Sequence, residues 1–224
     1  MSIILNIDTS IETASVSIAK DGIIQSSLKN TVQKEHASFV HNAVKQLTAT
    51  VSINIKQVDA VAVANGPGSY TGLRVGLASA KGFCYALNKP LITIGTLNAL
   101  AVAAINISTQ DNSPANLFCP MIDARRMELY TAVFDGKMKE ILPACAMIVT
   151  ETSFQEMLQN NHVLFAGSGA DKWSNICTSG KASFINELDI SAAIAQLSFK
   201  KFTGSNFTDL TYSEPLYVKD FFTP

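Results

Sequence analysis

The sequence carries a weak internal duplication, and this restricts the folds that are open to it. Residues 3–8 form an apolar run that ends in an aspartate, and residues 117–123 repeat this ending. An alternating segment and an Asp-Gly turn follow each run, from Asp8 to Asp21 in the first copy and from Asp123 to Asp135 in the second. Apolar alternation closed by Asp-Gly is typical of antiparallel hairpins. Each copy therefore predicts a meander of three strands.

The two copies continue in the same order after their hairpins. In the first, residues 35–47 place apolar side chains on one helical face, and residues 60–64 read as a buried strand before the glycine turn at residues 66–68. In the second, Ser-Phe-Gln-Glu at residues 153–156 predicts a capping box at a helix start. A short strand and a glycine turn at residues 163–169 follow that helix.

This repeated order predicts an α/β protein of two tandem RNase H-like lobes, the actin–hexokinase type, each a mixed sheet with flanking helices. We place the lobes at residues 1–108 and 109–224, a size that allows each an adequate core. Residues 96–107 predict a helix between the copies, and residues 191–202 predict one more. Residues 214–219 predict a final extended segment.

Composition excludes several classes of protein. Charged residues are 16% and hydrophobic residues 47%, which indicates a compact body rich in buried strands. The net charge is −1, and the only arginines are Arg74, Arg125 and Arg126, so the chain lacks the basic face of a protein that grips a polynucleotide unaided. Four cysteines without CxxC spacing indicate reduced thiols. The sequence begins in a strand and its longest apolar run, residues 99–105, is too short for a bilayer, so we expect a cytoplasmic protein.

A glycine-rich segment at residues 65–76 joins the predicted strand to a helical pattern. Free N–H groups at a helix N-terminus can hold a phosphate, and the Asp-Thr-Ser turn after the first strand is where proteins of this fold approach phosphate and metal. The simpler interpretation is a tight βα connection, since no Gly-Lys-Ser/Thr ending is present. The cofactor-binding candidates are Asp8, Thr9, Ser10, Gly68 and Ser69.

The helix expected over residues 72–87 carries Gly76, Ala80 and Cys84 at four-residue spacing. Each interior glycine costs a helix about 1 kcal/mol relative to alanine, so close packing must compensate. Small residues at this spacing form a ridge that a second element can approach closely. The ridge packs either on the protein's own sheet or against a partner protein.

The residues that should carry catalysis are missing. Residues 123–126, Asp-Ala-Arg-Arg, lack the glycines of a second phosphate loop, and Arg125 and Arg126 either meet an anion or pair with Asp123 or Glu128. His36 and His41 are five residues apart and point to different faces of a helix, with Val40 where a second ligand would stand. We therefore assign no catalytic residue and no metal.

With these segments in place, the chain resembles the TsaB (YeaZ) family. The resemblance rests on residues 4–10, 35–36, 65–81, 123–130 and 214–217, and residues 174–209 have no match. It implies a bacterial, non-catalytic subunit of the machinery that makes threonylcarbamoyladenosine at position 37 of tRNAs reading ANN codons. It further implies a heterodimer with the catalytic paralogue TsaD, joined by the ATPase TsaE, and a homodimer in the absence of TsaD.

The same resemblance implies that tRNA is met only through the complex, and ATP or ADP only at the junction with the partner. The partner interface implied by the first-lobe helices consists of His36, Phe39, Val40, Gly72, Leu73, Gly76, Ser79, Ala80 and Phe83. Two other functions stay open: a stand-alone ATP-dependent phosphotransferase or ATPase, and, less favoured, a glycoprotein peptidase. The glycine turns and Asp8 favour the phosphotransferase or ATPase, whereas the missing second phosphate loop argues against it.

Overall fold

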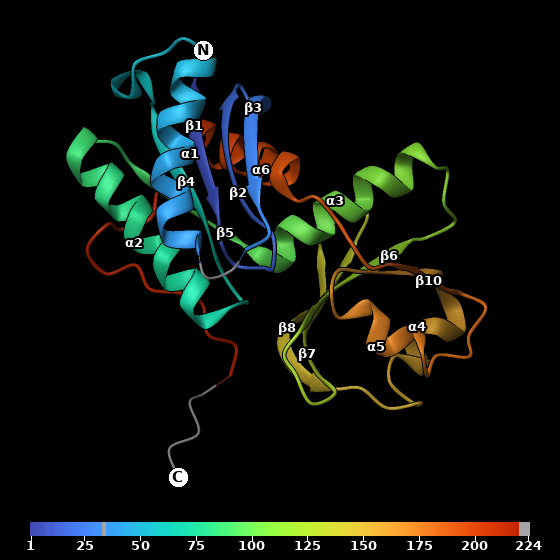
Figure 1. Cartoon of the computed structure of the whole chain (residues 1–224). Helices are drawn as coiled ribbons and strands as arrows, with labels where there is room; N and C mark the ends of the chain where they lie inside the picture. Colours follow the sequence, from blue (N-terminus) through green and yellow to red (C-terminus); the bar gives the residue numbers. More distant parts are fainter. Residues whose placement is uncertain (33–34, 220–224) are drawn as a thin grey trace. The chain divides into compact units, whose positions relative to one another are not determined.

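The computed structural model describes residues 1–32 and 35–219, and the chain divides into two compact units (Figure 1). The first unit comprises residues 1–96 and 190–216. The second comprises residues 97–189 and the segment from Tyr217. The division differs from the predicted lobes at 1–108 and 109–224, because the chain enters the second unit at residue 97 and returns to the first at residue 190.

The first unit is built on a five-stranded mixed sheet with the order β3-β2-β1-β4-β5. Strands β1 (Ile3–Asp8), β2 (Ala14–Lys20) and β3 (Ile23–Asn30) form the antiparallel meander. Strands β4 (Ala60–Gly66) and β5 (Leu91–Gly95) run parallel to β1. The carboxyl ends of β1 and β4 therefore lie at the same edge of the sheet, where the Asp8 turn meets the glycine-rich segment.

Helices cover both faces of this sheet. Helices α1 (His36–Thr50) and α2 (Tyr70–Leu87) pack against Leu5 and Ile7 of β1. Because side chains alternate along a strand, Asn6 points to the other face, where the hydroxyl of Ser198 donates a 2.7 Å hydrogen bond to its side chain.

That hydroxyl belongs to α6 (Ser191–Thr203). The ammonium group of Lys201, one turn further along this helix, donates to the backbone oxygen of Thr93 at 2.8 Å. These contacts explain why residues 190–216 belong to the first unit. A short 3₁₀ helix (Ile55–Gln57) leads from α1 to β4.

The second unit repeats the topology with the order β8-β7-β6-β9-β10. Strands β6 (Leu117–Asp123), β7 (Glu128–Asp135) and β8 (Glu140–Ile148) are antiparallel, while β9 (Val163–Ala166) and β10 (Ala182–Ile185) run parallel to β6.

Three helices accompany this second sheet: α3 (Thr96–Gln110), α4 (Gln155–Asn160) and α5 (Ala170–Ser174). Its core is aromatic, since Phe154, Phe165 and Trp173 lie within 5.3–6.0 Å of one another, centroid to centroid. On the other face Ala104 of α3 packs on Phe118 and Leu164. No helix of the described ranges has the length and hydropathy needed to cross a bilayer.

The predicted duplication and fold class are confirmed: both sheets have the same strand order and the same pattern of directions. The fifth strand of each sheet, β5 and β10, was not identified. The predicted capping box is wrong. Phe154 and not Ser153 precedes α4, in a left-handed conformation, while the Ser153 hydroxyl accepts from the backbone of Thr150.

Candidate functional site

The Asp8 turn is tied together by its own hydrogen bonds. The backbone N–H and the hydroxyl of Ser10 both donate to one carboxylate oxygen of Asp8, at 2.8 Å and 2.6 Å. The hydroxyl of Thr9 donates to the backbone oxygen of Gly72 at 2.7 Å. All three residues are buried, which holds the turn against the start of α2.

The glycines of the neighbouring segment are required by this turn. A Cβ at Gly68 would overlap the backbone oxygen of Ser10, and a Cβ at Gly72 would overlap that of Thr9. A Cβ at Gly76 would overlap the Thr9 hydroxyl. The chain's own backbone therefore fills the space beside the glycines, as the simpler interpretation of a tight βα connection requires.

Two N–H groups at the start of α2 are engaged in the same way. The N–H of Ser69 donates to the backbone oxygen of Ser10 at 2.7 Å, and the hydroxyl of Ser69 caps the helix by accepting from Gly72 N–H at 3.3 Å. The five cofactor-binding candidates thus lie together, with the Asp8 turn buried, Gly68 half-buried and Ser69 exposed. Nucleotide binding at this point stays a prediction.

The predicted ridge of small residues points inward. Gly76, Ala80 and Cys84 are buried, and Gly76 faces Thr9 and Val63 of the first unit's own core. The expectation that this ridge meets a partner is therefore corrected: it packs on the protein's own sheet. Six of the nine predicted interface residues are buried: His36, Val40, Gly72, Leu73, Gly76 and Ala80. The other three are half-buried: Phe39, Ser79 and Phe83.

The opposite face of α2 carries a second small-residue stripe, which we call the outer face. Ala78, Gly82 and Ala86 are four residues apart and exposed, and a Cβ at Gly82 would meet nothing within 4 Å. Tyr85 beside them is 85% exposed, an unusual position for a large ring. The spacing is visible in the sequence. However, the ridge of small residues has the same four-residue spacing, and only the structure shows which of the two faces of α2 is exposed.

The two histidines of α1 face different sides, as predicted. His41 is exposed and lies 5.3 Å from the Phe83 ring, centroid to centroid. His36 is buried beside the Glu12 backbone, and its Nε2 has no hydrogen-bond partner among the described residues. Burial lowers the pKa of His36, against the opposing effect of the bond to Glu12. Within residues 1–32 and 35–219, no three His, Cys, Asp or Glu side chains are grouped to hold a metal.

The corresponding turn of the second unit, residues 123–128, is held by ion pairs. The Lys172 ammonium lies 2.6 Å from the Asp123 carboxylate, and that of Lys219 lies 2.9 Å from Glu128. Burial alone would raise the pKa of Asp123, but Lys172 and the backbone N–H of Arg125 outweigh it and lower the pKa. Pairing with Asp123 or Glu128 was one of two roles left open for Arg125 and Arg126, and both of these carboxylates are bound to lysines.

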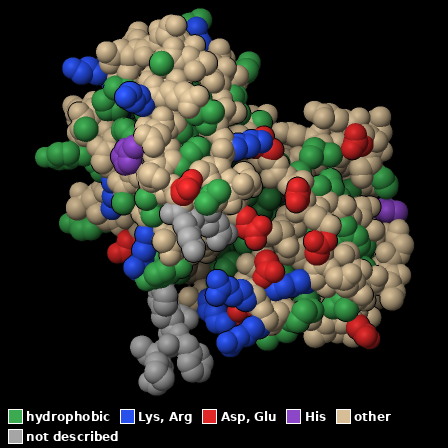
Figure 2. Space-filling model, viewed as in Figure 1, with side chains coloured by type: hydrophobic (Ala, Val, Ile, Leu, Met, Phe, Trp, Pro, Cys, Tyr) green, Lys and Arg blue, Asp and Glu red, His purple; other side chains and the backbone are tan. Residues whose placement is uncertain are grey.

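The backbone of this turn is unusual. Arg125, Arg126 and Met127 all have positive φ, of 70°, 45° and 61°, in a region that glycine favours. All three side chains are exposed. Figure 2 shows Lys and Arg side chains gathered in the region of β7 and α5, on a chain whose net charge is −1.

The four cysteines are free, and Cys84 and Cys119 are buried. Burial raises the pKa of Cys84 to about 11 and that of Cys119 to about 12, so neither is a thiolate near neutral pH.

Comparison with known proteins decides the family. A family model described as TsaD, tRNA N6-adenosine threonylcarbamoyltransferase, matches residues 24–207. The chain is 34% identical to the tRNA threonylcarbamoyladenosine biosynthesis protein TsaB of Haemophilus influenzae, over 57% of this chain and 51% of that protein. It is 25% identical to the protein of the same name from Escherichia coli, over 97% of this chain and 94% of that one.

The chain belongs to the TsaB (YeaZ) family of TsaD-like proteins. The match to the Haemophilus protein spans about half of that relative's length. The structure of YeaZ from Pseudomonas aeruginosa has the same fold, with a TM-score of 0.79 over 97% of this chain and all of that one, at 22% identity. The TsaB family resemblance read from the motifs is thereby confirmed.

Proposed function

We propose that this chain serves the biosynthesis of threonylcarbamoyladenosine in tRNA as a non-catalytic scaffold. In this role it binds and activates TsaD, the catalytic paralogue, and the ATPase TsaE joins the pair. Membership in the TsaB family supports the pathway, because the relatives from Haemophilus and Escherichia carry that pathway in their names. Any tRNA contact arises through the complex, and ATP or ADP is met only at the junction of the subunits.

The filled Asp8 turn is the observation that carries the scaffold role. A phosphate-binding loop needs backbone N–H groups that are open to the ligand. Here Ser69 N–H is bound to Ser10, Gly72 N–H to Ser69, and the glycines pack on Thr9 and Ser10. The second unit places arginines and a left-handed turn where a matching loop would carry glycines. Both features favour a role in binding a partner protein over a role in nucleotide-dependent catalysis.

We assign the partner contact to the outer face of α2 in place of the buried ridge. Ala78, Gly82 and Ala86 let a second helix approach closely, and the adjacent Tyr85 is the kind of exposed ring that interfaces bury. The half-buried Phe83 and the exposed His41 extend this surface onto α1. A homodimer formed in the absence of TsaD would use the same face.

The experiment compares two glycine variants in a strain that lacks the chromosomal gene. Gly82→Arg places a long cation on the outer face, whereas Gly180→Arg places one on the second unit, where a Cβ also meets nothing within 4 Å. Mass spectrometry of tRNA digests should show the modified nucleoside lost in the deletion strain and with Gly82→Arg, and restored with Gly180→Arg. A deletion strain with unchanged modification would refute the pathway. Restoration by Gly82→Arg would refute only the assigned face.

A further inference from the structure

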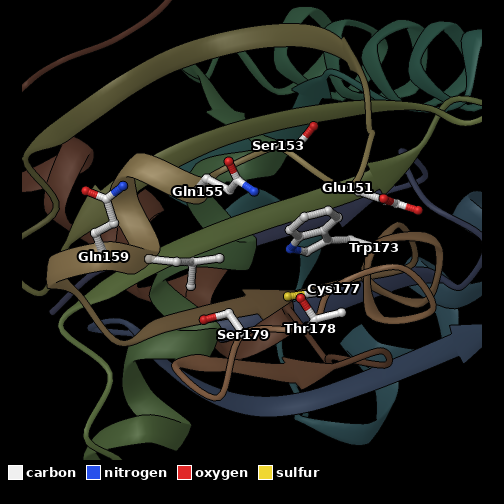
Figure 3. Close-up of a pocket in the computed structure, with 9 residues that line it drawn as sticks. Glu151, Ser153, Gln155, Gln159, Trp173, Cys177, Thr178 and Ser179 are labelled. Carbon is white, nitrogen blue, oxygen red and sulfur yellow. The ribbon is translucent and has the colours of Figure 1, made fainter.

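A pocket in the second unit lies between α4 and the chain that follows α5 (Figure 3). Its volume is about 230 Å³, and its apolar wall is formed by Trp173, Leu158 and Cys177. Cys177 belongs to the segment of the chain that has no match to the family motifs. None of the lining residues lies in the segments on which the family resemblance rests.

Trp173 brings an unused hydrogen-bond donor to this pocket. The residue is 1% exposed, and its indole N–H has no acceptor among the described residues. A buried indole N–H normally finds an acceptor, so this donor is available to an acceptor that enters the pocket. Figure 3 shows the nitrogen end of the ring turned toward the space ringed by Gln155, Gln159 and Ser179.

The indole is held rigidly in this orientation. Its ring packs against Phe154 at 5.6 Å and against Phe165 at 6.0 Å, centroid to centroid, in tilted and edge-on geometries. The left-handed conformation of Phe154 at the start of α4 brings that ring into the core. The donor is therefore fixed before a ligand arrives, which lowers the entropic cost of binding.

The rim of the pocket defines the ligand chemistry. Gln155, Gln159 and Thr178 offer side chains that both donate and accept hydrogen bonds, and Glu151 offers a carboxylate. The hydroxyls of Ser153 and Ser179 already accept from the backbone N–H groups of Thr150 and Lys181, respectively. A carboxylate at the rim disfavours an anion and favours a ligand N–H.

We propose that this pocket binds a small, uncharged carboxamide. Its carbonyl oxygen accepts from the indole N–H of Trp173, its amide N–H groups donate to the rim, and its apolar part lies against Leu158. This site lies beyond the proposed scaffold role and does not depend on it. The ligand class follows from one deep donor, an apolar wall and a rim that accepts N–H groups.

Trp173 is the chain's single tryptophan, so one indole N–H resonance reports on the site directly. The complete chain is titrated with benzamide, with toluene and with benzoate, and followed by ¹H–¹⁵N correlation spectra. Benzamide should move this resonance downfield in a saturable manner. Toluene, which lacks an acceptor, and benzoate, which is charged, should bind about tenfold more weakly or worse. No saturable shift with benzamide, or an equal one with toluene, would overturn the proposal.

Two sets of variants keep the test independent of folding. Trp173→Phe removes the donor and should weaken benzamide binding about tenfold in ligand-observed spectra. If that variant does not fold, the exposed pair Gln155→Ala and Gln159→Ala should give a comparable loss. Glu151→Gln should strengthen benzoate binding, whereas Glu156→Gln, an exposed residue of α4 outside the pocket, should leave it unchanged. Benzamide affinity that is unaffected by every pocket variant would contradict the assigned site.

Discussion

The two units share one topology but treat the turn after their first strand in opposite ways. In the first unit the turn at residues 8–10 is buried and packs on three glycines. In the second, residues 123–128 are largely exposed and are held by two lysines, with three left-handed residues at the surface. The first turn is held by packing of its backbone against glycines, and the second is held by ion pairs.

The difference shows how one topology can hold the same turn in two different ways. A phosphate loop needs open N–H groups and glycines in both copies. The first unit keeps the glycines but fills the space beside them with its own chain. The second keeps the aspartate, Asp123, but binds it to Lys172 and lacks the glycines.

The largest effect is expected from adding one methyl group to the first turn. Gly72→Ala should lower the free energy of unfolding by about 3 kcal/mol, because its Cβ would overlap the backbone oxygen of Thr9. Gly82→Ala on the same helix is the control, and should raise stability by about 0.5–1 kcal/mol. Urea unfolding followed by circular dichroism measures both. Equal effects of the two substitutions would show that the first turn is not closed by packing.

A smaller effect is expected from His36, which donates toward the backbone of Glu12 just beyond the first turn. Because burial lowers its pKa, the unfolded chain binds the proton more tightly than the folded chain does. Its contribution to stability is complete above pH 6.5, the ordinary value, and is lost as the pH falls through the folded pKa. His36→Phe should therefore flatten the decline in unfolding free energy between pH 7 and pH 5, measured by urea titrations at each pH. An unchanged decline would contradict the burial.

The smallest effect is expected from the charged turn of the second unit. Lys172→Met should cost about 0.5–1 kcal/mol at neutral pH, since the Asp123 carboxylate is 42% exposed and screened by solvent. The lowered pKa of Asp123 means that this difference is present above pH 3.8 and disappears as the pH falls further. Lys219→Met, whose own side chain is half-exposed, should cost less. Carbon-detected titration of Asp123 should show its pKa returning toward 3.8 with Lys172→Met only.

Period-two alternation and turn residues were sufficient to predict both meanders, and an apolar helical face was sufficient to predict α1. They did not identify β5 or β10. They could not place α6 on the first sheet either, since its contacts with Asn6 and Thr93 join residues more than 100 positions apart. Local pattern carries no information about such pairs.

The sequence was sufficient to choose the residues of the candidate site but not to say which of their faces are buried. The Asp8 turn and the glycine segment were grouped as binding candidates, and the structure places them side by side because β1 and β4 are parallel and end at one edge. The ridge of Gly76 and Ala80 was assigned to the wrong side, because α2 carries small residues at the same spacing on both faces. The pocket around Trp173 was not predicted, since no ligand-binding motif joins the residues that line it.

The central claim is that the first turn is closed and that the chain acts by binding a partner. Isothermal titration of the purified chain with ATP and magnesium, alone and with TsaD present, tests it most directly. We expect no binding heat and no hydrolysis by the chain alone, and nucleotide binding only in the presence of TsaD. Micromolar binding together with turnover by the isolated chain would contradict the claim.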